Sequence, residues 1–302
     1  MYLSIVTTTF NSEQTIDEFF KKVRLTLSEL KILKSEIIIV DDGSNDKTIQ
    51  KLKTIKENNQ NLTVISLSKN YGHHKALMTG LKEAVGDFIF LIDSDLEENP
   101  SFLKNFFDVI KDYDFVYGIQ KKRSAGLITN FLGNAFYNFF NLISYNKIPN
   151  NLTTMTLMRK KVMKELTKFN ENEVFFHGLL HTIGFTKKEI LIEKVFKGSS
   201  EYTFAKKIEL FFDAITAFSS IPLKLFFYFG FVITLFSSLY AFYILFAYFT
   251  LKITVPGFTT LLILILFFGG VITLGIGILG IYIHRIFLEV KKRPIVTIKD
   301  KF

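Results

Sequence analysis

Two aspartates one residue apart, at the end of an apolar run, have the most readily interpreted chemistry. Residues 88–92 are uninterrupted apolar side chains, and Asp93, Asp95, Glu97 and Glu98 follow directly. An apolar run of this length is typical of a buried strand, and ligands of α/β sheets bind beyond the carboxyl ends of strands. Mg²⁺ prefers carboxylate oxygens, usually together with substrate phosphates. The stretch therefore indicates a metal site or, alternatively, the capped and acidic first turn of a helix.

The first part of the chain alternates between apolar, β-rich segments and segments with helical periodicity. Strands are expected at 3–8, 36–40, 62–67 and 88–92, and helices at 15–33, about 47–58 and 75–84. This alternation predicts an α/β fold with a largely parallel sheet.

A polar or acidic cluster follows each of these four expected strands. The clusters are 8–11, 41–44, 68–70 and 93–95. Because parallel strands point the same way, all four clusters should lie at one edge of the sheet. Separate helix caps would explain Ser44 by itself, but they explain the doubled Asp41 and Asp42 less well.

Composition and missing motifs exclude several classes of protein. The chain has no cysteine, which excludes disulfides, thiolate metal sites and a cysteine nucleophile. It carries neither a G-x-G-x-x-G after the first strand nor a Walker lysine motif, which argues against dinucleotide dehydrogenases and P-loop NTPases. The net charge is +9, but the basic residues are scattered and no nucleic-acid motif is present. An anionic membrane surface and anionic substrates explain this charge better than nucleic acid.

Two long apolar runs, at about 225–250 and 258–283, occupy the C-terminal part of the chain. Between positions 225 and 284 the only formally charged residue is Lys252. Each run exceeds the roughly 20 residues that span a bilayer core. We therefore expect a transmembrane helical hairpin at 223–285, the alternative being a buried helical pair in a soluble core. Lysines and arginines flank the two runs, which predicts that both termini, including the tail 286–302, are cytoplasmic.

A set of short motifs, taken together, resembles a known family. In chain order they are Thr9-Phe10-Asn11-Ser12-Glu13; Val40-Asp41-Asp42-Gly43-Ser44 with Asp46 and Thr48; Asn70-Tyr71-Gly72 with Lys75 and Ala76; Gly80; and Asp93-Ser94-Asp95-Leu96 with Pro100. They resemble the inverting family 2 glycosyltransferases with a GT-A fold. Within these, the chain looks like the polyisoprenyl-phosphate glycosyltransferases, relatives of dolichyl-phosphate mannose synthase and of bacterial undecaprenyl-phosphate sugar transferases. The C-terminal hairpin extends the resemblance over nearly the whole chain.

The resemblance implies a role for several residues. Residues 1–120 would form a Rossmann-like GT-A core that binds a nucleotide diphosphate sugar. Asp41 and Asp42 would contact the base and ribose, and the turn 9–13 would close over the nucleotide. Asp93 and Asp95 would be the D-x-D pair, with Asp95 the direct ligand of Mg²⁺ or Mn²⁺ on the donor diphosphate. The other expected substrate-binding residues are Thr9, Asn11, Glu13, Ser44, Lys75, Lys194, Lys197, Ser200 and Tyr202.

The acceptor side, expected at 121–222, departs from the family pattern. Thr154 and Thr156 stand where many relatives carry an Asp and an Arg, and Glu201 stands where a Lys is common. Cations near the acceptor would have to come from elsewhere; the candidates are Arg123, Arg159, Lys194 and Lys197. The run 120–123 is either a solvated basic loop or a phosphate contact.

Two amphipathic segments and a pair of histidines complete this region. The aromatic segment 127–144 predicts a helix in the membrane interface, the alternative being a core helix, and 205–221 predicts a juxtamembrane helix. His177 and His181 have the i, i+4 spacing of metal ligands, but no acid pair is close in sequence, so a packing or hydrogen-bonding role is favoured.

The sequence therefore predicts transfer of a sugar from a nucleotide diphosphate sugar to a polyprenyl phosphate at the cytoplasmic face of a bacterial-type plasma membrane. One alternative is a saccharide or another lipid as acceptor, including processive synthesis. The chain has no Trp, and processive relatives usually carry a Q-x-x-R-W-type motif. A second alternative is a membrane scaffold with a degenerate transferase domain, against which the intact acid clusters argue. Relatives with this layout can be oligomers, so homo-oligomerisation stays open.

Overall fold

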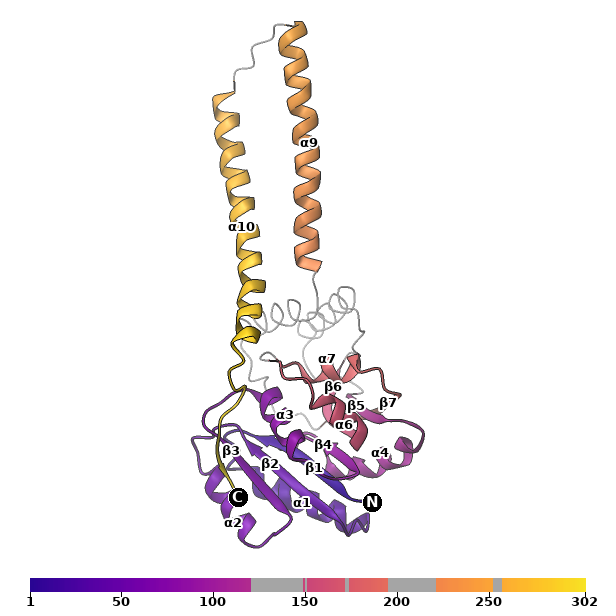
Figure 1. Cartoon of the computed structure of the whole chain (residues 1–302). Coiled ribbons are helices and arrows are strands. Elements are labelled where there is room, and N and C mark those ends of the chain that lie inside the picture. The colour runs from indigo at the N-terminus through magenta and orange to yellow at the C-terminus, as the bar shows by residue number, and fades with distance from the viewer. Residues whose placement is uncertain (121–148, 150, 172–173, 195–220, 252–256) are drawn as a thin grey trace. The chain divides into compact units, whose positions relative to one another are not determined.

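The computed structural model describes residues 1–120, 149, 151–171, 174–194, 221–251 and 257–302 (Figure 1). This part of the chain divides into two compact units. The first unit contains the N-terminal α/β region, the described residues up to 194, and Arg293–Phe302. The second contains the two long helices near the C-terminus.

The first unit is built on a mixed sheet. Within the described residues, eight strands pair in the order β7-β5-β6-β4-β1-β2-β3-β8. The strands are β1 (Leu3–Thr9), β2 (Ser35–Asp41), β3 (Leu62–Leu67), β4 (Phe88–Leu91), β5 (Phe115–Gln120), β6 (Leu152–Arg159), β7 (Lys187–Ile192) and β8 (Ile298–Lys301). The strands β4, β1, β2 and β3 are mutually parallel, whereas β6 and β8 run antiparallel on either side of them. The prediction of an α/β fold with a mostly parallel sheet is confirmed.

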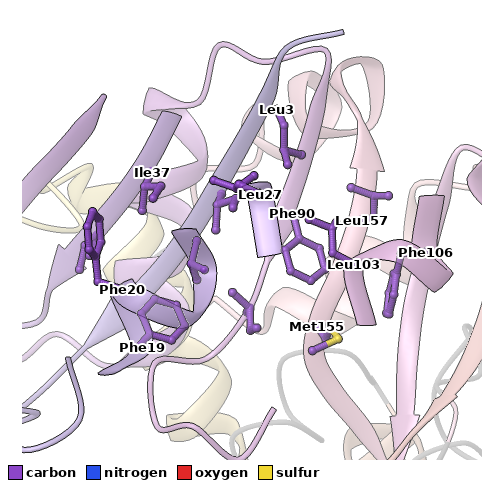
Figure 2. Close-up of a cluster of buried hydrophobic side chains, with 14 of the residues drawn as sticks. Leu3, Phe19, Phe20, Leu27, Ile37, Phe90, Leu103, Phe106, Met155 and Leu157 are labelled. Carbon is purple, nitrogen blue, oxygen red and sulfur yellow. The ribbon is translucent and has the colours of Figure 1, made fainter. Parts of the chain in front are cut away.

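One face of the sheet is covered by helices with a regular apolar stripe (Figure 2). In α1 (Ile16–Glu29) the residues Ile16, Phe19, Phe20 and Val23 are buried, a spacing that places them on one side of the helix. They pack with strand residues such as Leu3 in a single cluster, which α2 (Thr48–Glu57) and α4 (Leu103–Val109) also join. Fully burying one Phe contributes about 1.5–3 kcal/mol, so this face anchors the parallel strands firmly.

The opposite face is covered by α3 (His73–Glu83). This helix lies very close to the sheet at Gly80, where an added Cβ would be 2.6 Å from Cγ1 of Val6 and 3.0 Å from Cγ2 of Val40. Only glycine permits this approach, and the approach fixes the start of α3 at the carboxyl edge of the strands. The helix begins at His73 rather than at position 75 as the sequence predicted.

Shorter elements complete the first unit. They are the 3₁₀ turns η1 (Pro100–Phe102) and η2 (Ile110–Asp112) and the helices α6 (Lys160–Leu166) and α7 (Phe176–Thr182). After the second unit the chain returns to the sheet as β8, a strand that was not expected from the sequence of the tail.

The second unit contains α9 (Ile221–Leu251) and α10 (Phe258–Lys291). The two expected apolar spans lie within these helices. Among the described residues, Phe267–Lys291 is long and apolar enough to cross a membrane, and Leu223–Ser237 is a shorter apolar stretch. The expected interface helix at 127–144 lies outside the described residues, as does the expected juxtamembrane helix at 205–221 apart from Ile221.

Candidate active site

The acidic residues after β4 form a tight turn at the carboxyl edge of the parallel strands. Leu96 adopts a left-handed conformation with φ of 67°, and the backbone N–H of Glu97 donates to Oδ1 of Asp95 at 2.8 Å. The helical segment starts only afterwards, because Asn99 caps η1 by accepting from the N–H of Ser101 at 3.0 Å. Asp93 and Asp95 therefore lie ahead of the helix start and are not its cap. The helix-cap alternative is wrong for these two residues.

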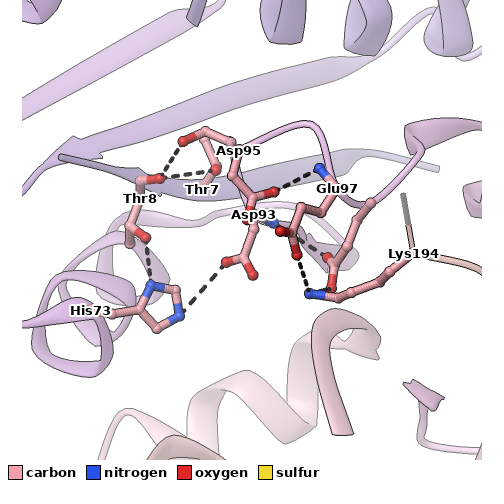
Figure 3. A network of polar contacts seen from close by, with 9 residues as sticks. Thr7, Thr8, His73, Asp93, Asp95, Glu97 and Lys194 are labelled. Carbon is pink, nitrogen blue, oxygen red and sulfur yellow. Dashed lines mark hydrogen bonds and ion pairs between the residues drawn. The ribbon is translucent and has the colours of Figure 1, made fainter. Parts of the chain in front are cut away.

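Asp93 is tied to neighbouring elements by a chain of polar contacts (Figure 3). The hydroxyl of Ser94 donates to the carbonyl of Thr8 at 2.8 Å, which joins the turn to β1. The Thr8 hydroxyl lies 2.8 Å from Nδ1 of His73, and Nε2 of His73 lies 3.8 Å from Oδ1 of Asp93. Sequence reasoning missed His73, although its position just after Gly72 at the sheet edge was a usable signal.

Glu98 and Lys194 form a buried ion pair behind the turn. Glu98 is 1% exposed, and the Lys194 ammonium lies 3.2 Å from its Oε1 and 3.7 Å from Oε2 of Glu97. Burial, reinforced by the charge of Asp93, raises the pKa of Glu98 to about 7. Burial alone would lower the pKa of Lys194, but Glu98, Asp93 and Asp95 outweigh it and raise that pKa. The cluster thus holds more acids than this one lysine neutralises.

This excess of negative charge fits a divalent cation. The surrounding protein raises the pKa of the Asp95 carboxyl by displacing water, and the charge of Asp93 raises it further. In the described part of the chain, no three His, Cys, Asp or Glu side chains are arranged to hold a metal by themselves. A pair of carboxylates completed by substrate phosphates is, however, a usual arrangement for Mg²⁺. Asp93 and Asp95 are the carboxylates available for it.

Asp41 ends β2 at the same edge, Asp42 follows it, and both are buried. The carboxylate of Asp42 accepts the backbone N–H groups of Tyr71 at 2.7 Å and Gly72 at 2.9 Å. That of Asp41 accepts the N–H of Ser44 at 3.1 Å with one oxygen, while its other oxygen is buried without a partner. Burial raises the pKa of each, and these hydrogen bonds act against the rise. The unsatisfied oxygen of Asp41 suits a hydrogen-bond donor on a ligand.

The turn after β1 is bound to the turn after β2. The N–H of Asn11 donates to Oγ of Ser44 at 2.8 Å, and Oδ1 of Asn11 accepts the N–H of Asn45 at 3.0 Å. Oε2 of Glu13 accepts the N–H of Lys47 at 3.1 Å. The side chains of Asn11 and Glu13 therefore hold the two turns together.

The remaining expected substrate-binding residues have mixed outcomes. Thr9 is buried at the edge, and its hydroxyl has no partner. Lys75 lies in the first turn of α3, the helix that also carries His73. Four residues lie outside the described part of the chain: Arg123, Lys197, Ser200 and Tyr202.

Arg159 is not part of this site. It pairs with Phe88 at the start of β4, the end of that strand opposite to Asp93. Its guanidinium donates to the carbonyls of Ile110, Lys111 and Tyr113, each at 3.0 Å. The expectation that Arg159 is an acceptor-side cation is therefore wrong, because its donors bind η2 and Tyr113, the residue after it.

Thr154 lies on the site side of β6. Leu91 pairs with Thr156 in the antiparallel register, so Thr154 is two residues nearer to the edge where Asp93 leaves β4. Thr154 is 8% exposed and Thr156 is fully buried. A hydroxyl thus lies toward this edge of the sheet, at the position where the family resemblance implies a carboxylate.

Buried histidines line the region between α3 and α7. The rings of His74 and His177 are 6.3 Å apart, and Nδ1 of each is buried without a partner. Burial lowers the pKa of His74 to about 3 and holds that of His177 well below its usual range. Nδ1 of His181 lies 2.9 Å from the carbonyl of His177. The expected hydrogen-bonding role is confirmed for His181.

His181 predicts a loss of stability at mildly acidic pH. Burial, then the charge of Lys187, lowers its pKa to about 4, from 6.5 for a free histidine. Between these two pKa values the unfolded chain therefore binds a proton at His181 that the folded chain does not bind. The contribution of neutral His181 to the free energy of unfolding is present above about pH 6.5. It decreases as the pH falls, by about 2 kcal/mol at pH 5.

The check is urea unfolding of the full chain in detergent at pH 7 and pH 5, followed by circular dichroism. Between the two pH values, we expect the free energy of unfolding of His181→Gln to fall by about 2 kcal/mol less than that of the unmodified chain. His284→Gln, at an exposed position in α10, is the control. Equal losses in all three proteins would contradict the prediction.

Comparisons with known proteins agree with this architecture. Residues 4–167 match the model of glycosyl transferase family 2. A putative glycosyltransferase from Mycobacterium tuberculosis is 36% identical over 301 residues, which cover 99% of this chain and 88% of the relative. The SfII prophage-derived bactoprenol glucosyl transferase of Shigella flexneri is 33% identical over 304 residues, covering 99% and 98%.

A solved structure supports the fold. The mannosyltransferase PcManGT from Pyrobaculum calidifontis, in complex with GDP-Man and Mn²⁺, superposes with a TM-score of 0.50 at 17% identity, covering 69% of this chain and 60% of its own. This likeness concerns the GT-A-like sheet alone. Both the family model and the nearly full-length relatives lead to one conclusion: the chain is a member of glycosyl transferase family 2.

Proposed function

We propose that this glycosyltransferase moves a sugar from a nucleotide diphosphate sugar to a polyprenyl phosphate at the cytoplasmic face of a membrane. One observation carries the proposal: a chain with a sheet edge rich in buried acids also carries long apolar helices, α9 and α10. The name of the Shigella relative, a bactoprenol glucosyl transferase, supports a lipid-linked acceptor.

The donor would bind along the edge formed by β2, β1 and β4. Asp41 and Asp42 would hold the base and ribose, since one buried oxygen of Asp41 lacks a partner. Asp93 and Asp95 would hold Mg²⁺ or Mn²⁺ beside the diphosphate, consistent with the Mn²⁺ and GDP-Man bound to the Pyrobaculum protein. The metal would neutralise negative charge on the leaving diphosphate. Lys194, held beside Glu98, would be a cation near this charge.

In the reaction a phosphate oxygen of the acceptor attacks the anomeric carbon of the donor. The bond between that carbon and the diphosphate oxygen breaks, the nucleoside diphosphate leaves, and the configuration inverts. A phosphate monoester has a second pKa of about 6 and is largely dianionic at neutral pH. It needs no base to remove a proton, so a hydroxyl at Thr154 is compatible with this chemistry. Holding donor and acceptor in line lowers the entropic part of the barrier.

The apolar helices would keep the enzyme at the lipid. We propose that 225–250 in α9 and 258–283 in α10 cross the bilayer as a hairpin, with the GT-A core 1–120, the acceptor region 121–222 and the tail 286–302 in the cytoplasm. The lysines and arginines that flank the hairpin support this orientation.

One alternative acceptor deserves a test because of Thr154. A hydroxyl acceptor, on a saccharide or another lipid, would need a base to take its proton, and a threonine cannot serve as one. Thr154 therefore favours a phosphate acceptor over a hydroxyl acceptor. It also supports, more weakly, a degenerate scaffold without activity.

The experiment supplies the full chain in detergent with radiolabelled UDP- and GDP-sugars, undecaprenyl phosphate, and Mg²⁺ or Mn²⁺. We expect organic-extractable, acid-labile label with at least one donor, and none when undecaprenol replaces the phosphate. Label in a water-soluble polymer would favour the saccharide acceptor. Absence of transfer from every donor would contradict the proposal and favour the scaffold.

A further inference from the structure

The segment that follows α10 is folded onto the edge of the catalytic sheet. Strand β8 runs antiparallel to β3, with Ser66 opposite Asp300. Phe302 and Val64 exchange two backbone hydrogen bonds, of 2.8 and 3.0 Å. The Phe302 ring packs against the core cluster, and the Lys53 ammonium lies 5.4 Å from the ring centroid. The last residues of the chain are therefore part of the first unit.

The start of this segment contacts the loop 68–72, which follows β3. The carbonyl of Thr297 accepts the N–H of Ser68 at 2.9 Å. The Tyr71 hydroxyl lies 3.0 Å from the Ser68 hydroxyl, and hydrogen bonds to Ser68 and then to Thr297 lower the pKa of Tyr71. Thr297 thus binds the loop through its main-chain carbonyl.

The same loop holds the carboxylate of Asp42. The consecutive N–H groups of Tyr71 and Gly72 donate to its two oxygens. A continuous series of hydrogen bonds therefore runs from Thr297, through the loop 68–72, to Asp42 at the end of β2.

The loop is also confined from its other side. Gly43 has φ of +74°, and a Cβ there would lie 2.7 Å from the backbone nitrogen of Asn70. The loop is therefore packed between Gly43 and the C-terminal segment. Without the segment, contacts on only one side would remain to define the position of Tyr71.

We propose that the C-terminal segment 297–302 positions the loop 68–72, and through it Asp42, for binding the nucleotide of the donor. The inference rests on the donor site assigned under the proposed function. It makes the segment a positioning element, which acts through Asp42 and touches no reacting atom. Its loss weakens donor binding and leaves the rate from bound donor unchanged.

The test compares the full chain with a chain ending at Val296, which lacks Thr297, β8 and Phe302, and with Tyr71→Phe, which keeps the main chain but lacks the hydroxyl. Lys299→Ala, at an exposed position of β8, is the matched control. Hydrogen exchange reports on the Tyr71 and Gly72 amides without any ligand. Titration with UDP or GDP in the presence of Mn²⁺ gives the dissociation constant, and transfer at saturating donor gives kcat.

We expect the shortened chain to exchange both amides about tenfold faster, as for a loss of about 1.4 kcal/mol of local stability, while the amide of Val6 in β1 is unchanged. Its dissociation constant rises about tenfold and its kcat stays within about twofold. Tyr71→Phe shows the same pattern with a smaller rise in the dissociation constant. If the shortened chain does not fold, the result for Tyr71→Phe tests the inference. Lys299→Ala behaves like the full chain.

Unchanged amide exchange and unchanged nucleotide affinity in a folded shortened chain would overturn the inference. A fall in kcat with unchanged nucleotide affinity would also overturn it. If the full chain binds neither nucleotide, the donor-site assignment fails, and the amide exchange still shows whether the segment orders the loop.

Discussion

Asp95→Asn is expected to lower kcat by at least about 100-fold, while the protein accumulates and folds normally. The substitution keeps the shape of the side chain and removes one of the two carboxylates available to the metal. Metal stabilisation of charge at the leaving group contributes several kcal/mol, and each 1.36 kcal/mol changes the rate tenfold. Folding should survive, because the side chain is exposed and an amide oxygen can still accept the N–H of Glu97.

The measurement is the initial rate of label transfer at saturating donor, with Mn²⁺ varied. Asp108→Asn is the matched control, because Asp108 is an exposed carboxylate on α4. We expect the control to retain full activity. A near-normal rate for Asp95→Asn would remove Asp95 from the metal site.

Gly43→Ala is expected to disrupt nucleotide binding and to destabilise the first unit. A left-handed φ costs a residue with a side chain about 1–2 kcal/mol. The new methyl group would also press against the backbone of Lys69 and Asn70, which cannot move without shifting the loop 68–72. That shift removes hydrogen bonds from the carboxylate of Asp42, which is 3% exposed.

The chain offers a close control in Gly184. This glycine has the same φ of +74°, but no atom lies within 4 Å of an added Cβ. Gly184→Ala therefore carries only the energetic cost of the left-handed backbone conformation. We expect a rise of at least about tenfold in the nucleotide dissociation constant for Gly43→Ala and none for Gly184→Ala. Equal behaviour of the two variants would show that the packing of the loop against Gly43 is unimportant.

The N-terminal half of the fold could be predicted from the sequence because its signals are local. The apolar run at 62–67 became β3 with the same bounds, and the stripe containing Phe19 and Val23 became the buried face of α1. The acid clusters met at one edge because parallel strands place their carboxyl ends together. Pairing between strands then brought Asp41 and Asp93 to the same edge without any further information.

Arg159 shows where proximity in sequence fails. It follows Thr154 by five positions, and both seemed to belong to one acceptor-side segment. In an extended strand, five residues span about 17 Å. Because β6 runs antiparallel to β4, that distance carries Arg159 from the acid edge to the opposite edge of the sheet.

His73 and β8 show a second limit. Residues 298–301 are mostly charged, and they form a strand only because the edge of β3 is available for pairing. The position of His73 after Gly72 indicates the sheet edge, but its 3.8 Å approach to Asp93 also depends on the packing of α3 against the sheet at Gly80, which the residues around position 73 do not indicate. Both features depend on tertiary contacts between segments that are distant in sequence.

The acceptor is the central claim, and the identity of both reaction products tests it most directly. Mass spectrometry of the lipid extract, with chromatography of the released nucleotide, would follow one reaction containing donor, undecaprenyl phosphate and Mn²⁺. The account predicts a lipid that carries a single phosphate esterified to the sugar, with one nucleoside diphosphate released per sugar transferred. A lipid with two phosphates and a released nucleoside monophosphate, or sugar attached to a hydroxyl acceptor instead, would contradict it.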